Sequence, residues 1–245
     1  MAITLADARI TSAEAIAANP AAIPVPYCKI LGVIGTEIRF QVLLPDAWNG
    51  RFLMGGNGGF AGSLDADGLW SVGAGYAFAS TDTGHQASTI QAGWALNNPE
   101  RIANWGHVGV HRTAETAKAV IRRYYGRAAA YAYFTGCSNG GRQALMEAQR
   151  YPQDFDGLIS GAPAYDITNI GGGFLKNIKA VFPTRNSART PVVTRDNLAL
   201  IECATLDACD VSDGVRDSVI DSPQRCRFSL ATVKRARTTS PPRTA

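Results

Sequence analysis

One stretch, residues 130–150, constrains the fold of this chain more than any other. "AYAYFTG" (130–136) predicts a buried strand, and residues 141–150, which end just before a proline, predict a helix. Between them lies "GCSNG" (136–140), the pattern G-x-S-x-G centred on Ser138. Glycines at such a turn allow close approach of strand and helix and a strained backbone angle, which is typical of a serine nucleophile. The alternative is a glycine-rich junction that only packs tightly.

If Ser138 is a nucleophile, an oxyanion must be stabilised beside it. The backbone amide of Asn139 lies at the start of the predicted helix, where amides and the helix dipole both favour negative charge. The glycine-dense loop "GGNGGFAG" (55–62) follows an earlier strand and can supply a second amide. Removal of one such donor typically raises the barrier by about 2.7–4 kcal/mol.

The rest of the chain predicts the architecture around this turn. Alternating or buried apolar runs predict strands at 37–45, 51–56, 75–81, 130–136 and 156–163, and helical spacing predicts a helix at 113–126. Strands alternating with helices indicate a mostly parallel α/β sheet. Beyond residue 164 the sequence becomes loop-rich, notably at 171–174 and 183–197. We therefore predict a first domain at 1–167, a partial second region at 168–228 and an unstructured tail at 229–245.

Charge and hydropathy exclude several classes of partner. The net charge is +4, but the last twelve residues carry four basic side chains and no acid, so the remainder is balanced at 20 basic against 20 acidic. A nucleic-acid-binding protein needs a basic face, and none is apparent, so no nucleic-acid partner is expected. No apolar run is long enough to span a membrane, so no membrane association is expected either.

The five cysteines are an odd number, so at least one lacks a partner within the chain. Cys203, Cys209 and Cys226 fall within 24 residues, which indicates a locally cross-linked segment and an oxidising compartment. The N-terminus has no basic region followed by an apolar core, so we expect no signal peptide in this sequence. The compartment therefore stays open, with cysteine usage favouring a secreted or periplasmic location.

The segment "FTGCSNGGRQALMEAQRYPQDFDGLISGAPA" (134–164) resembles the tannase and feruloyl esterase family, as do residues 27–62, 80–86 and 98–126. The resemblance implies an α/β-hydrolase with an inserted lid domain, acting on esters of aromatic acids: gallate esters, feruloyl sugars and, in one branch, a terephthalate monoester. It implies Ser138 as nucleophile and Asn139 as one oxyanion amide. The second oxyanion amide would come from Gly59 or Phe60. Cys137 would pair with a cysteine beside the catalytic histidine.

"CDVSDGVRDSVIDSPQRC" (209–226) is similar to the calcium loop of that family's lid. Three carboxylates crowd into eight residues, and a hard dication with oxygen ligands would relieve their repulsion. The spacing is not that of an EF-hand. A solvated acidic loop is the alternative. The resemblance implies a disulfide between Cys209 and Cys226 and a structural Ca²⁺ bound by Asp210, Asp213, Val215, Asp217 and Val219, the valines through their carbonyls.

The sequence offers no histidine in the position expected for the catalytic base. In α/β-hydrolases the acid and the histidine follow the serine, whereas His85, His107 and His111 all precede Ser138. Framework roles are the better interpretation for all three. The resemblance implies that the chain stops inside the lid, so that the C-terminal part of the sheet, with the triad Asp and His, is missing. The tail at 229–245 resembles out-of-frame translation.

Three hypotheses follow from the sequence. The first is a serine carboxylic ester hydrolase of the tannase and feruloyl esterase type, working through an acyl-enzyme, whose catalytic machinery is incomplete in this chain. The second is an inactive remnant that at most binds aromatic acids. The third is an unrelated hydrolase or acyltransferase that uses one of the three histidines as its base. The identity of the ester and the oligomeric state stay open.

Overall fold

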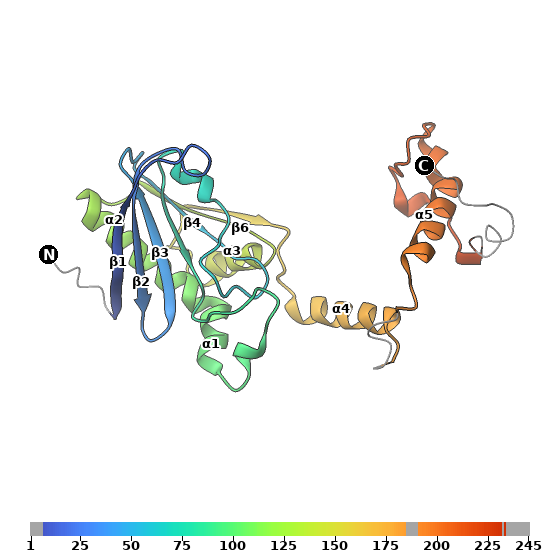
Figure 1. Cartoon of the computed structure of the whole chain (residues 1–245), viewed down its shortest axis with the longest axis horizontal. Helices are drawn as coiled ribbons and strands as arrows, with labels where there is room; N and C mark the ends of the chain where they lie inside the picture. The colour runs from blue at the N-terminus through green and yellow to red at the C-terminus, as the bar shows by residue number, and fades with distance from the viewer. Residues whose placement is uncertain (1–6, 185–190, 232, 234–245) are drawn as a thin grey trace. The chain divides into compact units, whose positions relative to one another are not determined.

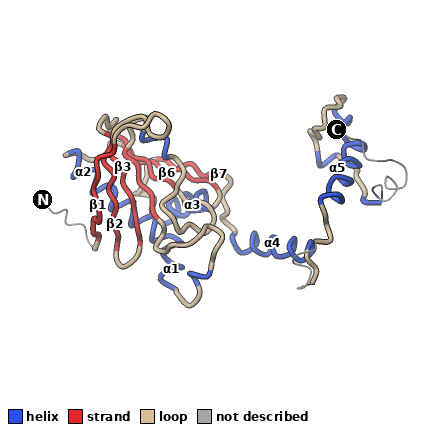
Figure 2. Tube along the Cα trace, viewed as in Figure 1, coloured by secondary structure: helices blue, strands red, loops and turns tan. Residues whose placement is uncertain are grey.

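The computed structural model describes residues 7–184, 191–231 and 233. The chain divides into two compact units, residues 1–167 and 168–245. Within the described residues, every strand lies in the first unit, whereas the second contains helices and loops (Figure 2). None of the helices in the described part is long and apolar enough to cross a membrane.

The first unit is built on one seven-stranded sheet in the order β1-β2-β3-β5-β4-β6-β7 (Figure 1). The strands β1 (Ala8–Ile16), β2 (Tyr27–Ile34) and β3 (Ile38–Pro45) form an antiparallel meander, and β3 pairs antiparallel with β5 (Ala77–Thr81). The pairings of β4 (Arg51–Gly55) with β5 and β6 (Tyr131–Cys137), and of β6 with β7 (Gly157–Gly161), are all parallel. Five of the seven strands, β2, β5, β4, β6 and β7, therefore run in one direction.

Alternation along these strands builds a core on each face of the sheet. Phe52 and Met54 of β4 join Phe134 of β6 in the larger cluster, whereas Leu53 joins Phe78 on the opposite face. Helices α2 (Gly109–Tyr125) and α3 (Asn139–Arg150) cover the first face, with α2 packed on β3 and β5 and α3 on β6 and β7. A 3-10 turn, η1 (Leu69–Val72), covers part of the other face.

The helix α2 continues an unbroken helical run. This helical run begins with α1 (Pro99–Ala103), which is capped by the Asn98 side chain. It continues through a π-helical turn, η3 (Asn104–Val108), into α2. A short 3-10 turn, η2 (Gly93–Ala95), precedes α1. In the second unit lie α4 (Ile167–Val181), α5 (Arg195–Cys209), η5 (Asp210–Asp213) and η6 (Pro223–Arg225).

The structure confirms the predicted α/β-hydrolase-type fold and the five predicted strands, and differs from expectation at three places. Strands β1 and β2 were not predicted. The helices start earlier than expected, at Gly109 rather than 113 and at Asn139 rather than 141. Residues 171–174 lie inside the helix α4 although three glycines predicted a loop, because the surrounding apolar residues follow helical spacing. Most of the predicted tail at 229–245 lies outside the described residues.

Candidate active site

Ser138 stands at the sharp turn between β6 and α3. Its backbone angles, φ 59° and ψ −115°, are a strained conformation for a residue with a side chain. The turn is fixed by three backbone hydrogen bonds. The Ser138 amide donates to the Gly161 carbonyl at 3.0 Å, and the Ser138 carbonyl accepts from Arg142 and Ala164 at 3.1 and 2.9 Å. The side chain is exposed, and its hydroxyl makes no hydrogen bond with the described part of the chain.

The glycines around Ser138 permit this geometry through close backbone contacts. A Cβ on Gly136 would lie 2.5 Å from the carbonyl carbon of Gly140, and a Cβ on Gly141 would lie 2.3 Å from the carbonyl oxygen of Gly161. These contacts involve backbone atoms, which cannot move aside as a flexible side chain could. The turn therefore requires glycine here to bring β6, α3 and β7 together.

A further hydrogen bond to the turn comes from the segment before η1. The carboxylate of Asp67 accepts a hydrogen bond from the Cys137 amide at 2.7 Å. Cys137, Cys28 and Cys203 have free thiols. Cys137 and Cys203 are exposed, and Cys28 is partly buried. The pairing that the family resemblance implied for Cys137 is therefore not formed within the described residues, and it stays a prediction.

The first-turn amide of Asn139 and the glycine loop provide the candidate oxyanion donors. Within the described residues the amides of Asn139, Gly58 and Gly59 have no hydrogen-bond partner, and both glycines are exposed. The Phe60 amide instead donates to the carbonyl of Thr89 at 2.7 Å. Of the two loop residues predicted from the sequence, Gly59 therefore has an amide available to a ligand in this conformation, and Phe60 does not.

Two buried polar side chains on α3, which the sequence analysis did not single out, hold these parts together. Gln143 accepts from the Asn57 amide at 2.9 Å and donates to the Asn57 side-chain oxygen at 3.3 Å. The Arg142 guanidinium donates to the Asn139 side chain and to the carbonyls of Trp105 and Gly106, at 2.8–2.9 Å. Burial lowers the pKa of Arg142 to about 10, so it remains a cation at neutral pH. The sequence signal that could have revealed these two residues is their position just after the G-x-S-x-G pattern. Polar side chains near the buried start of a helix need hydrogen-bond partners.

Aromatic side chains extend from the glycine loop to the helical run. The ring of Trp105 lies 6.1 Å from Phe60 and 6.3 Å from Trp94, and the Arg142 guanidinium lies 4.0 Å from its centre. Trp94 stacks on His85 at 3.8 Å. The rings of Phe60, Trp94 and Trp105 thus form one contiguous wall of aromatic side chains, which begins on the glycine loop.

The three histidines all lie in the framework. Burial lowers the pKa of His85, although the neighbouring backbone of Phe60 and Thr83 favours the protonated ring. His107 Nδ1 lies 2.7 Å from the Tyr151 hydroxyl. His111 Nδ1 lies 2.6 Å from Asp154 Oδ2. Within the described residues no histidine forms a hydrogen bond with Ser138.

A separate cluster joins α2 to α3. Ligand atoms of His111, Glu147 and Asp154 lie within 4.8 Å of one another, the only such group of three among the described residues. Glu147 is 1% exposed, and its Oε2 has no hydrogen-bond partner. Burial, followed by the negative charge of Asp154, raises the pKa of Glu147 to about 9. At neutral pH the Glu147 carboxyl therefore holds a proton, which removes the charge that would otherwise be buried beside Asp154. Asp154 already faces His111 and, at 3.9 Å, Lys118.

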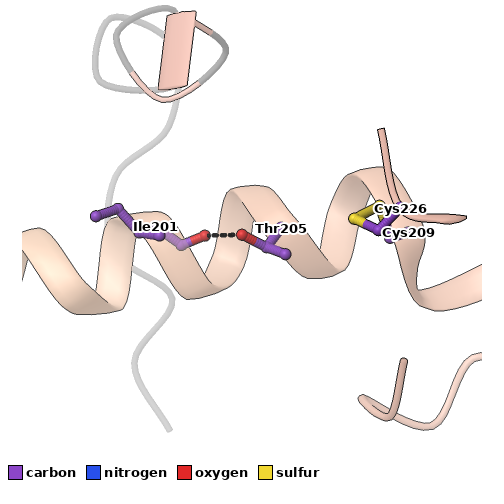
Figure 3. The surroundings of a disulfide bond; sticks show 4 residues. All are labelled: Ile201, Thr205, Cys209 and Cys226. Atoms are coloured by element: carbon purple, nitrogen blue, oxygen red, sulfur yellow. Dashed lines mark hydrogen bonds between the residues drawn. A yellow bond between two sulfur atoms is a disulfide. The ribbon is translucent and has the colours of Figure 1, made fainter. Parts of the chain in front are cut away.

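The segment 209–226, which we call the aspartate loop, lies in the second unit. Cys209 and Cys226 form the predicted disulfide at the end of α5, near the hydrogen bond from the Thr205 hydroxyl to the Ile201 carbonyl at 2.7 Å (Figure 3). Asp210 is buried and accepts from the Ser218 amide at 2.9 Å.

Two further carboxylates of the aspartate loop accept hydrogen bonds from backbone amides two residues further along the chain. Asp213 accepts from the Val215 amide at 2.9 Å, and Asp217 accepts from the Val219 amide at 3.1 Å. One oxygen of each carboxylate is used in this way and the other stays available, so the donor set suits a hard cation. The three carboxylates do not all converge within 4.8 Å here. Ser218 has φ 66°, a conformation that favours glycine.

A strained serine between a parallel strand and a helix, with a glycine loop packed on the start of that helix, is the arrangement typical of an α/β-hydrolase. The model of the family described as "Tannase and feruloyl esterase" matches residues 26–242, which is most of the chain. The chain therefore belongs to that family of esterases.

The relatives are similar over a large part of this chain. An uncharacterized esterase of Xanthomonas campestris is 37% identical over 82% of this chain and 35% of its own length. A mono(2-hydroxyethyl) terephthalate hydrolase of Piscinibacter sakaiensis is 31% identical over 87% of this chain and 40% of its own length. The crystal structure of feruloyl esterase B from Aspergillus oryzae has a TM-score of 0.81 at 27% identity, covering 93% of this chain and 48% of that one. The chain thus spans 35–40% of the length of these two curated relatives.

Proposed function

We propose that this chain carries the nucleophile and oxyanion hole of a serine carboxylic ester hydrolase that acts on esters of aromatic acids. The observation that carries the proposal is the exposed, strained Ser138 at the start of α3, where the Asn139 amide has no partner among the described residues and the glycine loop that carries Gly59 packs through Gly56. The names of the relatives, which include a terephthalate monoester hydrolase and feruloyl esterases, support an aromatic acyl group.

In this mechanism the Ser138 hydroxyl oxygen attacks the ester carbonyl and forms a tetrahedral oxyanion. The amides of Asn139 and Gly59 donate hydrogen bonds to that oxyanion, and the dipole of α3 adds to them. The serine proton passes to a histidine oriented by an acid, then to the departing alcohol. Water hydrolyses the resulting acyl-enzyme. The acid and the base are not identified in this chain.

In the part of the chain that the structure describes, no histidine forms a hydrogen bond with Ser138, and this observation favours a second candidate function. Here the chain binds aromatic acids against the wall of Phe60, Trp94 and Trp105 without turnover. This candidate predicts binding of ferulate and no covalent chemistry at Ser138.

One experiment separates the two. The full chain is incubated with 4-nitrophenyl ferulate, digested with trypsin and analysed by mass spectrometry for a feruloyl group on peptide 128–142. Acylation that disappears in Ser138→Ala supports the hydrolase. Saturable binding of ferulate to an unacylated chain supports the binding remnant. Rapid acylation that is lost in one of the variants His85→Ala, His107→Ala or His111→Ala would instead point to an unusual base.

We also propose that the aspartate loop binds a structural Ca²⁺. The carboxylates of Asp210, Asp213 and Asp217 and the carbonyls of Val215 and Val219 would hold it. The ion would neutralise the clustered charge and fix the loop that the disulfide closes. The disulfide in turn supports an oxidising compartment, secreted or periplasmic, as the location of the protein.

A further inference from the structure

Two adjacent residues near the N-terminal end of α3 each hold one side of the candidate oxyanion hole. We propose that Gln143 positions the glycine loop and that Arg142 positions Asn139, so that the two amides face the same point beside Ser138. This inference rests on the proposed function and concerns how its oxyanion hole is kept in place.

The glycine loop is attached through Asn57. The Asn57 backbone amide and side-chain oxygen are both bonded to Gln143, and both side chains are 2% exposed. The Asn57 side-chain nitrogen lies 2.9–3.3 Å from three carbonyl oxygens further along the chain, those of Ser63, Asp65 and Thr81. A Cβ on the neighbouring Gly56 would lie 2.7 Å from the Cα of Gly140, so the glycine loop also contacts the start of α3 directly. The position of Gly58 and Gly59 therefore depends on Asn57, and Asn57 depends on Gln143.

The other side of the hole is attached through Arg142. This residue is 6% exposed and is paired with no carboxylate among the described residues. A buried cation without an anion is costly unless other contacts compensate it. Here each of the three guanidinium nitrogens donates to an oxygen, of Asn139, Trp105 or Gly106, and the group lies 4.0 Å from the centre of the Trp105 ring. The guanidinium holds the Asn139 side chain, and hence its amide, against the η3 turn. It also leaves an uncompensated positive charge at the end of α3 where the oxyanion would form.

Conservative substitutions test this arrangement. Gln143→Glu keeps the acceptor for the Asn57 amide but places a second acceptor against the Asn57 side-chain oxygen. Arg142→Lys keeps the charge but has no planar fork to reach three oxygens. Gln149→Glu and Arg150→Lys make the same chemical changes at exposed positions of the same helix and serve as controls.

The readout is the affinity of the full chain for 4-carboxyphenylboronic acid, whose tetrahedral adduct with Ser138 places an oxygen in the oxyanion hole. Terephthalate, which has no boron, reports binding that does not need the hole. We expect Gln143→Glu and Arg142→Lys to weaken boronate binding by about 10²-fold, as for loss of one oxyanion donor, with terephthalate binding and both controls unchanged. Thermal melting shows which variants are folded. If Gln143→Glu is unfolded at the assay temperature, Arg142→Lys carries the test.

The outcomes of the boronate assay separate a failure of the positioning role from a failure of the proposed function. Equal boronate affinity in wild type and in folded Arg142 and Gln143 variants would overturn the positioning role while leaving the proposed function intact. Equal losses of boronate and terephthalate affinity would also overturn it, because they indicate a general loss of structure. If the wild type forms no adduct that depends on Ser138, the proposed function fails, and the inference fails with it.

Discussion

Replacement of Glu147 by glutamine gives the sharpest physical test of this structure. The Glu147 carboxyl is 1% exposed and lies against Asp154, and burial together with that charge raises its pKa from the ordinary 4.5 to about 9. Between these two pH values the folded protein holds a proton that the unfolded chain releases. Because the folded state binds the additional proton, stability falls as pH rises through this window.

The magnitude follows from proton linkage. One extra proton in the folded state lowers the free energy of unfolding by about 1.4 kcal/mol for each pH unit. From pH 5 to pH 8 this amounts to roughly 4 kcal/mol, a large part of the 5–15 kcal/mol that is typical of a domain. Glu147→Gln removes the titrating group and keeps its shape. We expect the variant to gain stability relative to wild type by about that amount as pH rises from 5 to 8.

Urea unfolding followed by tryptophan fluorescence measures this difference. Trp48, Trp70, Trp94 and Trp105 all lie in the first unit, so the signal reports that unit alone. Glu115→Gln is the matched control, because this carboxylate also lies beside His111 but its side chain is 59% exposed. A stability difference between wild type and Glu147→Gln that stays constant from pH 5 to pH 8 would refute the reasoning, since it would mean that Glu147 is ionised in the folded protein.

Three further outcomes are expected. Gly136→Ala should abolish acylation of Ser138 and lower the urea midpoint, because its Cβ would lie 2.5 Å from the Gly140 backbone. The control Gly58→Ala, whose Cβ meets nothing within 4 Å, should stay folded. Equal urea midpoints for the two variants would contradict the contact argument. Phe134→Ala should destabilise the first unit by about 3–5 kcal/mol, because this fully buried ring packs on Phe155 at 5.4 Å; a loss below 1 kcal/mol in urea unfolding would show that the core is looser than described. If the aspartate loop binds Ca²⁺, isothermal titration of the full chain should give a binding signal that is lost in Asp210→Asn and kept in Asp196→Asn, and no signal in wild type would reject the ion.

Much of the fold could be predicted because its signals are local. The strands around Phe40 and Phe134 show alternation, and the strand around Phe52 is a short buried apolar run, so all three are visible within a few residues. The sharp turn at Ser138 is encoded by neighbouring glycines. Strand β1, by contrast, reads "ARITSAEAI", with few residues of high β-propensity. Its pairing with β2 is a long-range interaction, so a single-sequence pattern does not reveal it.

By itself, the sequence determined the chemistry that is available: a serine at a strained strand-to-helix turn, glycines that let the strand and the helix approach closely, and three carboxylates crowded into eight residues near cysteines. Those features follow from residue type and spacing along the chain. Only the tertiary structure decided which amides are available and which side chains hold them. The Phe60 amide is occupied by Thr89, Gln143 reaches Asn57, and Arg142 reaches the π-helical turn. These contacts join residues up to 86 positions apart, and only folding brings such residues together.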